Sequence, residues 1–520
     1  MKTYNALVIG CGIAGCVTAI RLAESMDNVA LITKEENPLN ANTFYAQGGI
    51  IYKGETDAWD ILKQDIMFAG GGISKEDAVG VLCDYGAADV REFLIKKIQV
   101  PFARDEEGKL DLTDEGAHSQ RRIIHCADNT GEVILRFLHD YIYKNTNIEF
   151  IANHNVIDLI TSDTIEDPLK KYGEQHCIGA YIQNNETGEI DALFSENVIL
   201  ATGGCGNIYQ NTTNPISATG DGYAIARRAG AQLINMEYTQ FHPTTLYHAS
   251  GDRFLISESV RGEGGTLRTR EGDAFMKKYH KMGDLAPRDI VTRSILDIMI
   301  TKKIPCVFLD CSSIGKEELK ERFPNIYSTC LEKYHFDITK SWIPVTPAFH
   351  FMCGGIKTDT YGRTNLNGLY AVGETACTGL HGANRLASTS LLEGLVFGIR
   401  VAENIINRNR EKTEPISFPV IALPKNNKEK GVDPVILQQF LQTLKSVMWN
   451  LAGPIRTYDR LKIALKTLVD MEENIEELYY EYRIEKSILE LRNAVQTGVA
   501  IARAARNNKN SKGCHYILED

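Results

Sequence analysis

Three glycines near the N-terminus, Gly10, Gly12 and Gly15, form a GxGxxG turn of the kind that binds phosphate groups. The first permits a tight turn, the second lets the backbone approach a pyrophosphate, and the third lets a helix pack on a strand. Unpaired N–H groups at the positive end of that helix then face the negative phosphates. The pattern alone is weak, but here an apolar run precedes it and a helical pattern follows it. This context predicts a dinucleotide site.

The end of the second expected strand indicates which dinucleotide binds. An NAD site usually has an acidic residue there, which binds a ribose hydroxyl. This chain has Thr33 and Lys34 instead, with Glu35 and Glu36 just beyond. The replacement argues against an ordinary NAD site and is compatible with FAD held by hydroxyl and ammonium donors. Segment 42–49, Asn-Thr-Phe-Tyr-Ala-Gln-Gly-Gly, has small and amide groups suited to a flavin, although alone it fits a glycine-rich turn equally well.

Two further residues have side chains suited to acid–base or carboxylate-binding chemistry, and each has a plain structural alternative. His242 precedes a proline, where a histidine also fits as a turn residue that only satisfies its own hydrogen bonds. Arg288 lies between Pro287 and Asp289, which equally suits a surface residue paired with its neighbour in the first turn of a helix. Neither residue identifies a reaction by itself.

Apolar patterning predicts the elements that position these residues. Tyr4–Ile9 and Val29–Thr33 are expected strands, and Cys16–Ser25 between them has helical periodicity, which together make a βαβ unit. Two later apolar runs, 197–200 and 368–372, end in glycine-rich loops. We expect both to be strands of the same sheet that deliver loops to a ligand.

The stretch between those later strands has its own helical patterns, which suggests an inserted domain, and the C-terminal part has helical spacing broken near Gly453–Pro454 and Asn474. We therefore predict an α/β fold: a Rossmann-like FAD-binding domain with an inserted α+β capping domain and a C-terminal helical bundle. The expected boundaries are 1–237 and 348–407 for the FAD-binding domain, 238–347 for the capping domain, 408–432 for a linker and 433–520 for the helical domain.

Composition excludes several classes of partner. The chain has 520 residues, 43% of them hydrophobic, which is enough for several cores, and its net charge of -10 gives no reason to expect nucleic acid or anionic lipid as a partner. Twelve cysteines include no C-x-x-C pair, so we expect reduced thiols and no metal site. No stretch approaches the roughly 20 apolar residues of a membrane span, so we expect a cytoplasmic location away from the membrane.

The order of the motifs is more specific than any one of them. After the glycine turn come Thr-Phe-Tyr-Ala-Gln-Gly-Gly (43–49), Ala-Thr-Gly-Gly (201–204), Thr-Gly-Asp-Gly (219–222), Gln-Phe-His-Pro-Thr (240–244), Arg-Gly-Glu-Gly-Gly (261–265) and Gly-Leu-His-Gly-Ala-Asn-Arg-Leu-Ala-Ser (379–388). This succession resembles the flavoprotein family of succinate dehydrogenase, fumarate reductase and L-aspartate oxidase. The resemblance covers the whole chain.

Three features favour the aspartate-oxidizing branch of that family. Members with covalent flavin place a histidine near residue 42, where this chain has Asn42, so the resemblance implies non-covalent FAD. Segments 112–119 and 285–291 are similar to the oxidase pattern. Glu115, in the first of them, falls where the oxidases place a carboxylate near the substrate amine.

The resemblance also implies the residues of the site. A nearby acid, Glu258 or Glu263, as a proton relay is a hypothesis beyond the resemblance. Around the substrate it implies Arg288 as proton donor, Glu115 at the amine, Arg385 with His350 at one carboxylate, and His242 with Ser257 at the other. Around FAD it implies Gly10, Cys11, Gly12, Ile13, Ala14, Gly15, Lys34, Asn42, Thr43, Gln47, Gly48, Gly49, Val156, Asp221, Glu374, Ser390 and Leu391.

The implied reaction moves a hydride from the α-carbon of L-aspartate to N5 of FAD and gives iminoaspartate, the first step of de novo NAD biosynthesis, with O2 or fumarate taking the electrons. A quinolinate synthase would then be the next enzyme. Three alternatives remain: a soluble fumarate reductase, a flavoprotein subunit of a respiratory complex, and a flavin-binding protein without catalysis. Asn42 disfavours the complex, and Arg288, His242 and Arg385 together disfavour the last.

The C-terminus departs from the family pattern. Relatives usually end the helical domain with Glu-Ser-Arg-Gly-x-His, whereas this chain has Asn-Ser-Lys-Gly-Cys-His at 510–515. Lysine keeps the charge of arginine but loses its planar bidentate fork. The sequence assigns no role to this tail.

Overall fold

A five-stranded parallel sheet forms the centre of the fold, and four of its strands are buried along their whole length. Such strands are apolar throughout because both faces of a parallel sheet are covered. The computed structural model describes residues 2–54, 58–162, 175–251, 253–411, 418, 421–424, 426 and 428–518. In spatial order the strands are β18 (Leu369–Ala371), β11 (Val198–Leu200), β2 (Ala6–Ile9), β3 (Val29–Ile32) and β7 (Glu149–Ile151).

The alternation of side chains along β2 sends residues to two different cores. Val8 packs with the helices on one face, and Leu7 packs with the opposite face. The helices on the first face are α1 (Ile13–Ala23), α3 (Glu76–Asp89), α4 (Thr130–Asn145) and α10 (Thr389–Glu411). The second face is covered by α5 (Asp221–Arg228), by an antiparallel sheet and by the C-terminal helices; that sheet contains β1 (Lys2–Thr3), β10 (Ile190–Phe194), β9 (Cys177–Asn184) and β8 (His154–Thr161).

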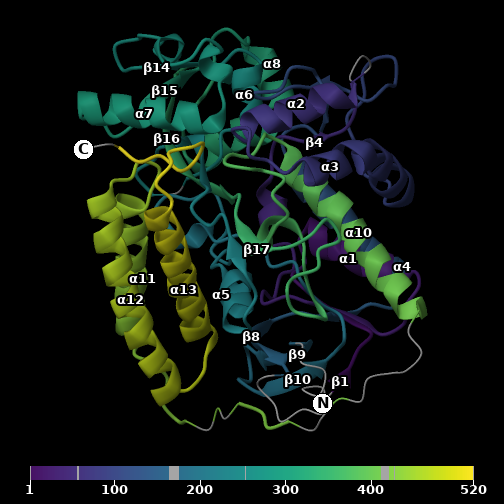
Figure 1. The fold of residues 1–520 in the computed structure, drawn as a ribbon. Coiled ribbons are helices and arrows are strands. Elements are labelled where there is room, and N and C mark those ends of the chain that lie inside the picture. Colours follow the sequence, from purple (N-terminus) through teal and green to yellow (C-terminus); the bar gives the residue numbers. More distant parts are fainter. Residues whose placement is uncertain are drawn as a thin grey trace.

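The region expected to cap the site is a second four-stranded sheet with its own core. Its strands, in spatial order, are β13 (Thr239–Leu246), β16 (Ile343–Met352), β15 (Val307–Asp310) and β14 (Thr266–Arg268). The helices packed with it are α6 (Ser259–Gly262), α7 (Arg288–Lys302), α8 (Lys316–Arg322) and α9 (Pro324–Ser328). Figure 1 shows this unit at the top of the molecule, above the parallel sheet.

Three long helices form the C-terminal part: α11 (Pro434–Leu451), α12 (Tyr458–Glu481) and α13 (Lys486–Asn507). They stand together on the left of Figure 1, and α13 lies beside α5. The expected break at Gly453–Pro454 separates α11 from α12. The break expected near Asn474 was wrong, because Asn474 lies inside α12 and its side-chain amide donates to the carbonyl of Asp470 one turn earlier. Asparagine that bonds back to its own helix does not end it.

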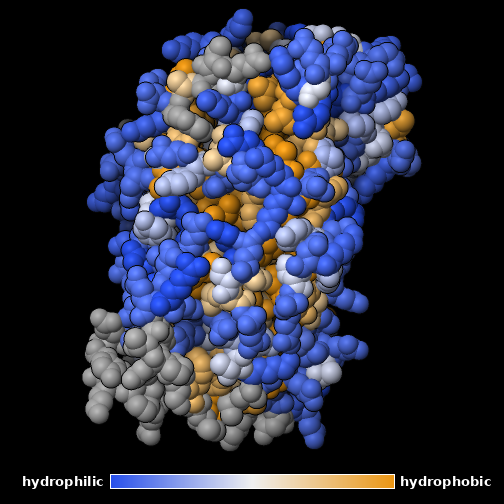
Figure 2. All heavy atoms as spheres, turned by 90° about the vertical axis from the view of Figure 1, so that its right-hand side faces the viewer, coloured by the Kyte–Doolittle hydropathy of each residue, from blue (hydrophilic) through white to orange (hydrophobic). Residues whose placement is uncertain are grey.

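Smaller elements complete the first domain: α2 (Trp59–Ala69), a π-helical turn (Val90–Lys97), and a small sheet of β4 (Ile50–Ile51), β6 (Ile123–Ile124) and β5 (Leu112–Thr113). Figure 2 shows the α2, α3 and α10 side of the molecule, where hydrophilic residues dominate and apolar residues lie in patches between them. Among the described residues, no helix combines the length and apolar character needed to cross a bilayer.

The predicted fold class is confirmed, with shifts at element ends. Helix α1 begins at Ile13 rather than Cys16, so Gly15 belongs to the helix and not to the turn before it. All twelve cysteines are buried and free, as expected from their spacing. The exact domain boundaries remain predictions, and most of the first half of the expected linker, 412–417, together with 419–420, lies outside the described residues.

Candidate active site

One large cavity lies between the parallel sheet, the capping sheet and α13. It encloses roughly 1770 Å³ of empty space, its open mouth included. All the residues predicted around the substrate and FAD except Gly15 line it, as does Glu258 but not Glu263. The structure therefore brings the two predicted sets together in one place, and the role of each residue remains a prediction.

The turn after β2 approaches the cavity at one end. Gly10 has φ of +112°, and a Cβ atom built there would lie 2.1 Å from the carbonyl oxygen of Ala201, so only glycine fits. Gly15 does not line the cavity, but a Cβ on it would lie 1.8 Å from the carbonyl oxygen of Gly10, which explains the close packing of α1 on the strand. No side chain caps α1 at Gly12. The helix terminus is thus suited to phosphate.

The middle of the cavity is lined by amide side chains and one acid. Asn42 donates from Nδ2 to Oε2 of Glu374 over 2.9 Å, and the backbone N–H of Met352 donates to the other oxygen of Glu374 over 3.0 Å. Burial raises the pKa of Glu374 to about 7, although both hydrogen bonds favour the ionised form. No imidazole stands at position 42 to form a bond with a flavin.

Several buried polar atoms of the cavity wall have no hydrogen-bond partner within the described part of the chain. They are Oδ1 of Asn42, Oε1 of Gln47, both amide atoms of Asn155 and Nε of Arg385. Buried polar groups are nearly always hydrogen-bonded, so such a set indicates a polar ligand. Together with the phosphate-binding turn, these donors and acceptors fit FAD.

At the other end of the cavity, two histidines come from neighbouring strands of the capping sheet. His242 on β13 pairs with Ala348 on β16, two residues before His350, and the two imidazole rings lie 5.1 Å apart. The backbone N–H of Thr244 donates to Nδ1 of His242 over 3.2 Å. Nδ1 also lies 3.1 Å from the carbonyl oxygen of Thr244, so both of these contacts use Nδ1, and Nε2 has no hydrogen-bond partner among the described residues. His242 thus lies in a strand rather than in a turn, and its role at a substrate carboxylate remains a prediction.

Arg288 is the first residue of α7 and is buried, with 6% of its surface exposed. Its Nε donates to Glu258 over 2.5 Å, and its Nη1 donates to Oε1 of Gln240 over 3.2 Å. The expected alternative, a surface ion pair with Asp289, was wrong, because Asp289 pairs with Arg293 instead. Two partners orient the guanidinium of Arg288 and leave Nη2 without a partner among the described residues.

Glu258 and Glu263, the two acids considered as relays, differ in position. Glu258 is 1% exposed and also accepts from Arg261 over 2.9 Å. Burial disfavours its ionised form, but the guanidinium groups of Arg288 and Arg261 outweigh burial and lower its pKa to about 2. Glu263 instead lies near Arg121 and Arg322, without a contact to Arg288 among the described residues. The geometry favours Glu258.

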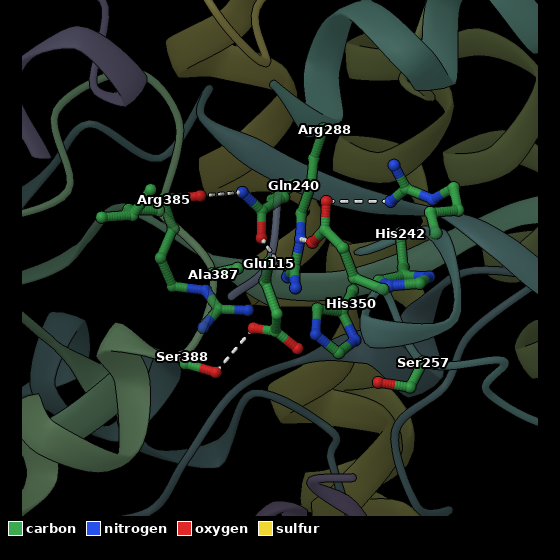
Figure 3. A network of polar contacts seen from close by, with 12 residues as sticks. Glu115, Gln240, His242, Ser257, Arg288, His350, Arg385, Ala387 and Ser388 are labelled. Atoms are coloured by element: carbon green, nitrogen blue, oxygen red, sulfur yellow. Dashed lines mark hydrogen bonds and ion pairs between the residues drawn. The ribbon is translucent and has the colours of Figure 1, made fainter. Parts of the chain in front are cut away.

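Arg385 enters the cavity from the loop before α10. Its guanidinium carbon lies 4.3 Å from the centre of the Phe351 ring, and its Nη1 donates to Ser390 over 2.9 Å. Burial, with the nearby charge of Arg288, lowers its pKa to about 10, so it stays cationic at neutral pH. Figure 3 shows Arg385 and Arg288 on opposite sides of Glu115, with the two histidines beside them.

Glu115 is held at both oxygens by serine hydroxyls. Ser388 donates to Oε2 over 2.6 Å and Ser259 donates to Oε1 over 3.1 Å. A Cβ on Gly48 would lie 2.3 Å from Oε1, so any side chain at this position of the expected flavin segment would displace the carboxylate of Glu115. Burial and the charge of Glu258 raise the pKa of Glu115, while Arg288 and the two hydroxyls oppose that rise. The group is therefore poised to change charge more easily than an exposed glutamate.

Both histidines are neutral in this setting. Burial, then the positive charge of Arg288, lowers the pKa of His242 and of His350 well below the ordinary value. His350 contacts the hydroxyl of Thr213 through Nδ1 at 2.8 Å. Ser257 lines the cavity beside them, and its Oγ lies 3.2 Å from Oγ of Ser259. Cationic and neutral donors thus surround a space that suits a dicarboxylate.

The divergent C-terminal tail supports the loop that carries Arg385. The backbone N–H of Cys514 donates to the carbonyl of Ala383 over 2.9 Å, and Arg293 of α7 donates to the carbonyl of Gly513 over 2.7 Å. His515 is fully buried against Arg456 at 2.7 Å. The tail therefore links α7 of the capping region to the Arg385 loop, a contact that the sequence did not indicate.

Sequence reasoning missed five residues that line the cavity or contact its charged side chains. Gln240, Arg261 and Ser388 stand inside quoted motifs, and the positive φ of Ser388, +55°, marks a strained position that only the structure reveals. Ser259 and Glu490 had no sequence signal, since they come from a short helix and from α13.

Two known families match the chain. A family described as "FAD binding domain" matches residues 5–391, and one described as "Fumarate reductase flavoprotein C-term" matches residues 441–519. The first covers the cavity wall from the glycine turn to the start of α10. The cofactor of this chain is therefore FAD.

Curated relatives match along nearly the whole chain. "L-aspartate oxidase 1" of Ralstonia nicotianae is 41% identical over 99% of this chain and 95% of its own length. "L-aspartate oxidase" of Pseudomonas aeruginosa is 39% identical, with the same coverage, and "L-aspartate oxidase, chloroplastic" of Arabidopsis thaliana is 38% identical over 100% of this chain and 81% of its own. The chain belongs to the L-aspartate oxidase family.

Solved structures show where this L-aspartate oxidase family member stands among flavoproteins. An E. coli quinol fumarate reductase superposes with a TM-score of 0.88 and 26% identity, covering 100% of this chain and 92% of the other. Sdh1 of Mycobacterium smegmatis superposes with a TM-score of 0.79 and 29% identity, covering 99% and 89%. The fold is thus shared with a quinol fumarate reductase and with Sdh1, and substrate choice has to come from side chains in the cavity.

Proposed function

We propose that this chain oxidises L-aspartate to iminoaspartate with FAD, and that O2 or fumarate then receives the electrons. The observation that carries the proposal is Glu115: a buried carboxylate, oriented by two hydroxyls, in a cavity that also contains two buried arginines. A plain dicarboxylate has no group that could donate a hydrogen bond to the carboxylate of Glu115. An α-amino dicarboxylate has an ammonium group, which can donate one.

In this proposal, cationic and neutral hydrogen-bond donors of the cavity hold the two substrate carboxylates. Arg385 donates to one carboxylate, with His350 beside it, and the neutral His242 with Ser257 donates to the other. Rigid supports favour this arrangement, because Arg385 lies on Phe351 and both histidines are on paired strands. A preorganised site loses little entropy when it orients the α-carbon of the substrate.

Glu115 accepts a hydrogen bond from the substrate ammonium and takes up a proton as the amine becomes a better electron donor. Its raised pKa makes this uptake easier than for an exposed glutamate. Ser388 and Ser259 keep the carboxylate aimed at one point. Succinate, which lacks the amine, leaves this buried acid without a partner.

Arg288 acts at the substrate carboxylate that His242 and Ser257 bind. When fumarate is reduced, Arg288 delivers a proton to the substrate carbon. Gln240 and Glu258 hold the guanidinium in one orientation. Glu258 stays ionised at neutral pH and is placed to pass a proton between Arg288 and Arg261, which supports it as the relay over Glu263.

FAD, when bound, supplies the hydride acceptor that none of the side chains can provide. The residues that would hold it are the turn at Gly10–Ala14 at one end, where Lys34 and Asp221 also line the cavity, and Asn42, Gln47 and Glu374 toward the flavin.

We expect the flavin to be non-covalent, because Asn42 offers no ring nitrogen and its amide nitrogen already donates to Glu374. Precipitation of the purified protein with acid should leave the yellow flavin in the supernatant, where chromatography identifies it as FAD. Colour that remains with the protein pellet would refute this expectation.

Product analysis tests the proposed reaction. Purified protein with L-aspartate in air should produce peroxide and, after hydrolysis of the imine, ammonia and oxaloacetate in equal amounts; without oxygen, fumarate should be converted to succinate at the expense of aspartate. A soluble fumarate reductase, the runner-up that the 0.88 TM-score keeps open, would reduce fumarate with a reduced dye and leave aspartate untouched.

A quinolinate synthase is the proposed consumer of iminoaspartate, because an imine hydrolyses in water and needs a partner that uses it promptly. Such a link would place the reaction in NAD biosynthesis. The cytoplasmic location expected from the sequence remains a prediction that accompanies this proposal.

A further inference from the structure

The end of β3 raises a question that the flavin chemistry does not answer. In a dinucleotide fold the ribose of the adenosine lies beyond the second strand, where an acidic residue accepts from its hydroxyls. This chain has Thr33 and Lys34 there. The next acid, Glu35, already accepts a hydrogen bond at each oxygen, because Lys486 donates to one over 2.7 Å and Asn40 to the other over 2.9 Å.

Lys34 forms ion pairs at the end of β3 with two carboxylates from distant parts of the chain. Its Nζ donates to Asp221 at the start of α5 over 2.7 Å, to Glu490 on α13 over 2.8 Å, and to the hydroxyl of Thr219 over 2.8 Å. Burial works against the charge of Lys34, but the two acids outweigh it and raise its pKa. The ammonium is thus saturated by protein groups and serves as their anchor.

The two acids differ in how many of their oxygens remain available. Both oxygens of Asp221 are occupied: one by Lys34, the other by Thr219 over 3.0 Å and by Asn493 over 2.9 Å. Glu490 uses Oε1 for Lys34, and its Oε2 has no hydrogen-bond partner among the described residues. Glu490 lines the cavity and is 21% exposed at the side chain. Its free oxygen is the acceptor that β3 does not supply.

A separate feature marks this end of the cavity as a ligand site. Asn155 is 4% exposed and lines the cavity, and neither its amide nitrogen nor its amide oxygen has a partner in the described part of the chain. It lies next to the end of β3, because the N–H of the preceding residue, His154, donates to the carbonyl of Thr33 over 3.0 Å. A buried donor and acceptor pair of this kind suits a heterocyclic base.

We propose that Glu490, on the last helix of the C-terminal domain, accepts a hydrogen bond from a hydroxyl of the adenosine ribose of FAD. Lys34 holds Glu490 there, so a lysine and an acid from opposite ends of the sequence replace the single acid at the end of the second strand. The helical domain then forms part of the cofactor site, and FAD binding and the docking of α13 beside α5 stabilise each other.

Nucleotide binding to the full chain freed of its flavin tests this proposal without any substrate turnover. ADP, 2′-deoxy-ADP and 3′-deoxy-ADP are compared as competitors of FAD, whose fluorescence reports binding. The wild-type chain should bind ADP about tenfold more tightly than one of the two deoxy analogues, as expected for a hydrogen bond to a charged group. Glu490→Ala should bind FAD and ADP about tenfold more weakly and should lose that preference.

Lys486→Gln is the matched control. Lys486 lies one turn before Glu490 on α13 and bridges to Glu35 from the same helix, but it does not line the cavity. This variant should keep the preference of the wild type for ADP. Three results would overturn the proposal: a wild-type chain that does not discriminate against either deoxy analogue, a Glu490→Ala variant that still discriminates, or a Lys486→Gln variant that does not. None depends on whether aspartate is the substrate.

Discussion

Replacement of Arg288 by lysine is expected to lower kcat for both aspartate oxidation and fumarate reduction by at least about 100-fold, the lower end for loss of a positioned general acid. Arg288 divides its planar fork between Glu258 and Gln240 and keeps Nη2 for the substrate. A lysine has one point of charge and cannot make these contacts together. Steady-state kinetics with each substrate, with FAD content measured in parallel, gives the answer.

Arg268→Lys is the control for this experiment, because Arg268 also pairs with a carboxylate, Asp310, over 2.7 Å, but lies outside the cavity. It should change kcat by less than about twofold, as surface charge pairs contribute little. If Arg288→Lys retained more than about a tenth of the wild-type rate with a full load of FAD, Arg288 would not have the role proposed here.

Replacement of Glu115 by glutamine should separate the two reactions. The kcat/KM for L-aspartate should fall roughly 10-fold to 150-fold, the equivalent of about 1.5–3 kcal/mol for a hydrogen bond to a charged group. Fumarate has no amine, so its reduction should change by less than about threefold. Glu263→Gln, an acid nearby that does not line the cavity, should leave both reactions unchanged. An equal loss in both reactions would point to a distorted site and would contradict the assignment of Glu115.

The same residue predicts the acid limb of the pH profile. Glu115 must be ionised to accept from the substrate ammonium, and its pKa is raised by burial and by Glu258. Aspartate turnover should therefore fall as the pH drops through that raised pKa, at a higher pH than for an ordinary glutamate. Fumarate reduction should not show this limb, and in Glu115→Gln the limb should disappear from what remains of aspartate turnover.

The sequence predicted the parts of the fold that depend on local pattern. The βαβ unit at the N-terminus follows from apolar alternation and three glycines, and the same signal located the start of the cofactor site. Where a local pattern was ambiguous, the prediction shifted or was wrong: α1 starts three residues earlier than expected, and Asn474 does not end α12 because its side chain bonds within the helix.

The site residues were predictable only where a motif carried them. His242 and Arg288 each had an alternative interpretation as a purely structural residue. For Arg288 the structure excludes the surface ion pair, because Asp289 pairs with Arg293 and Arg288 is buried with Glu258. The serines that hold Glu115 could not be predicted, because Ser259 and Ser388 meet it across more than a hundred residues of sequence. Hydrogen bonds between such distant segments produce no residue spacing in the sequence from which they could be predicted.

Glu490 is the clearest example of this limit. The sequence revealed that an acid was missing after β3, and nothing in residues 486–507 indicates that α13 supplies one. Only the packing of α13 beside α5 brings the two together. Arg288 of the capping region and Glu490 of α13 both line one cavity. In the two proposals they contribute to its opposite ends, Arg288 to the substrate end and Glu490 to the adenosine end.

Anaerobic mixing of the FAD-loaded protein with its candidate substrates tests the central claim most directly, because it needs no electron acceptor. L-aspartate should bleach the visible absorbance of the bound flavin within the time of a catalytic turnover, whereas succinate at the same concentration should leave it unchanged. Bleaching by succinate as fast as by L-aspartate, or none by L-aspartate, would contradict the account.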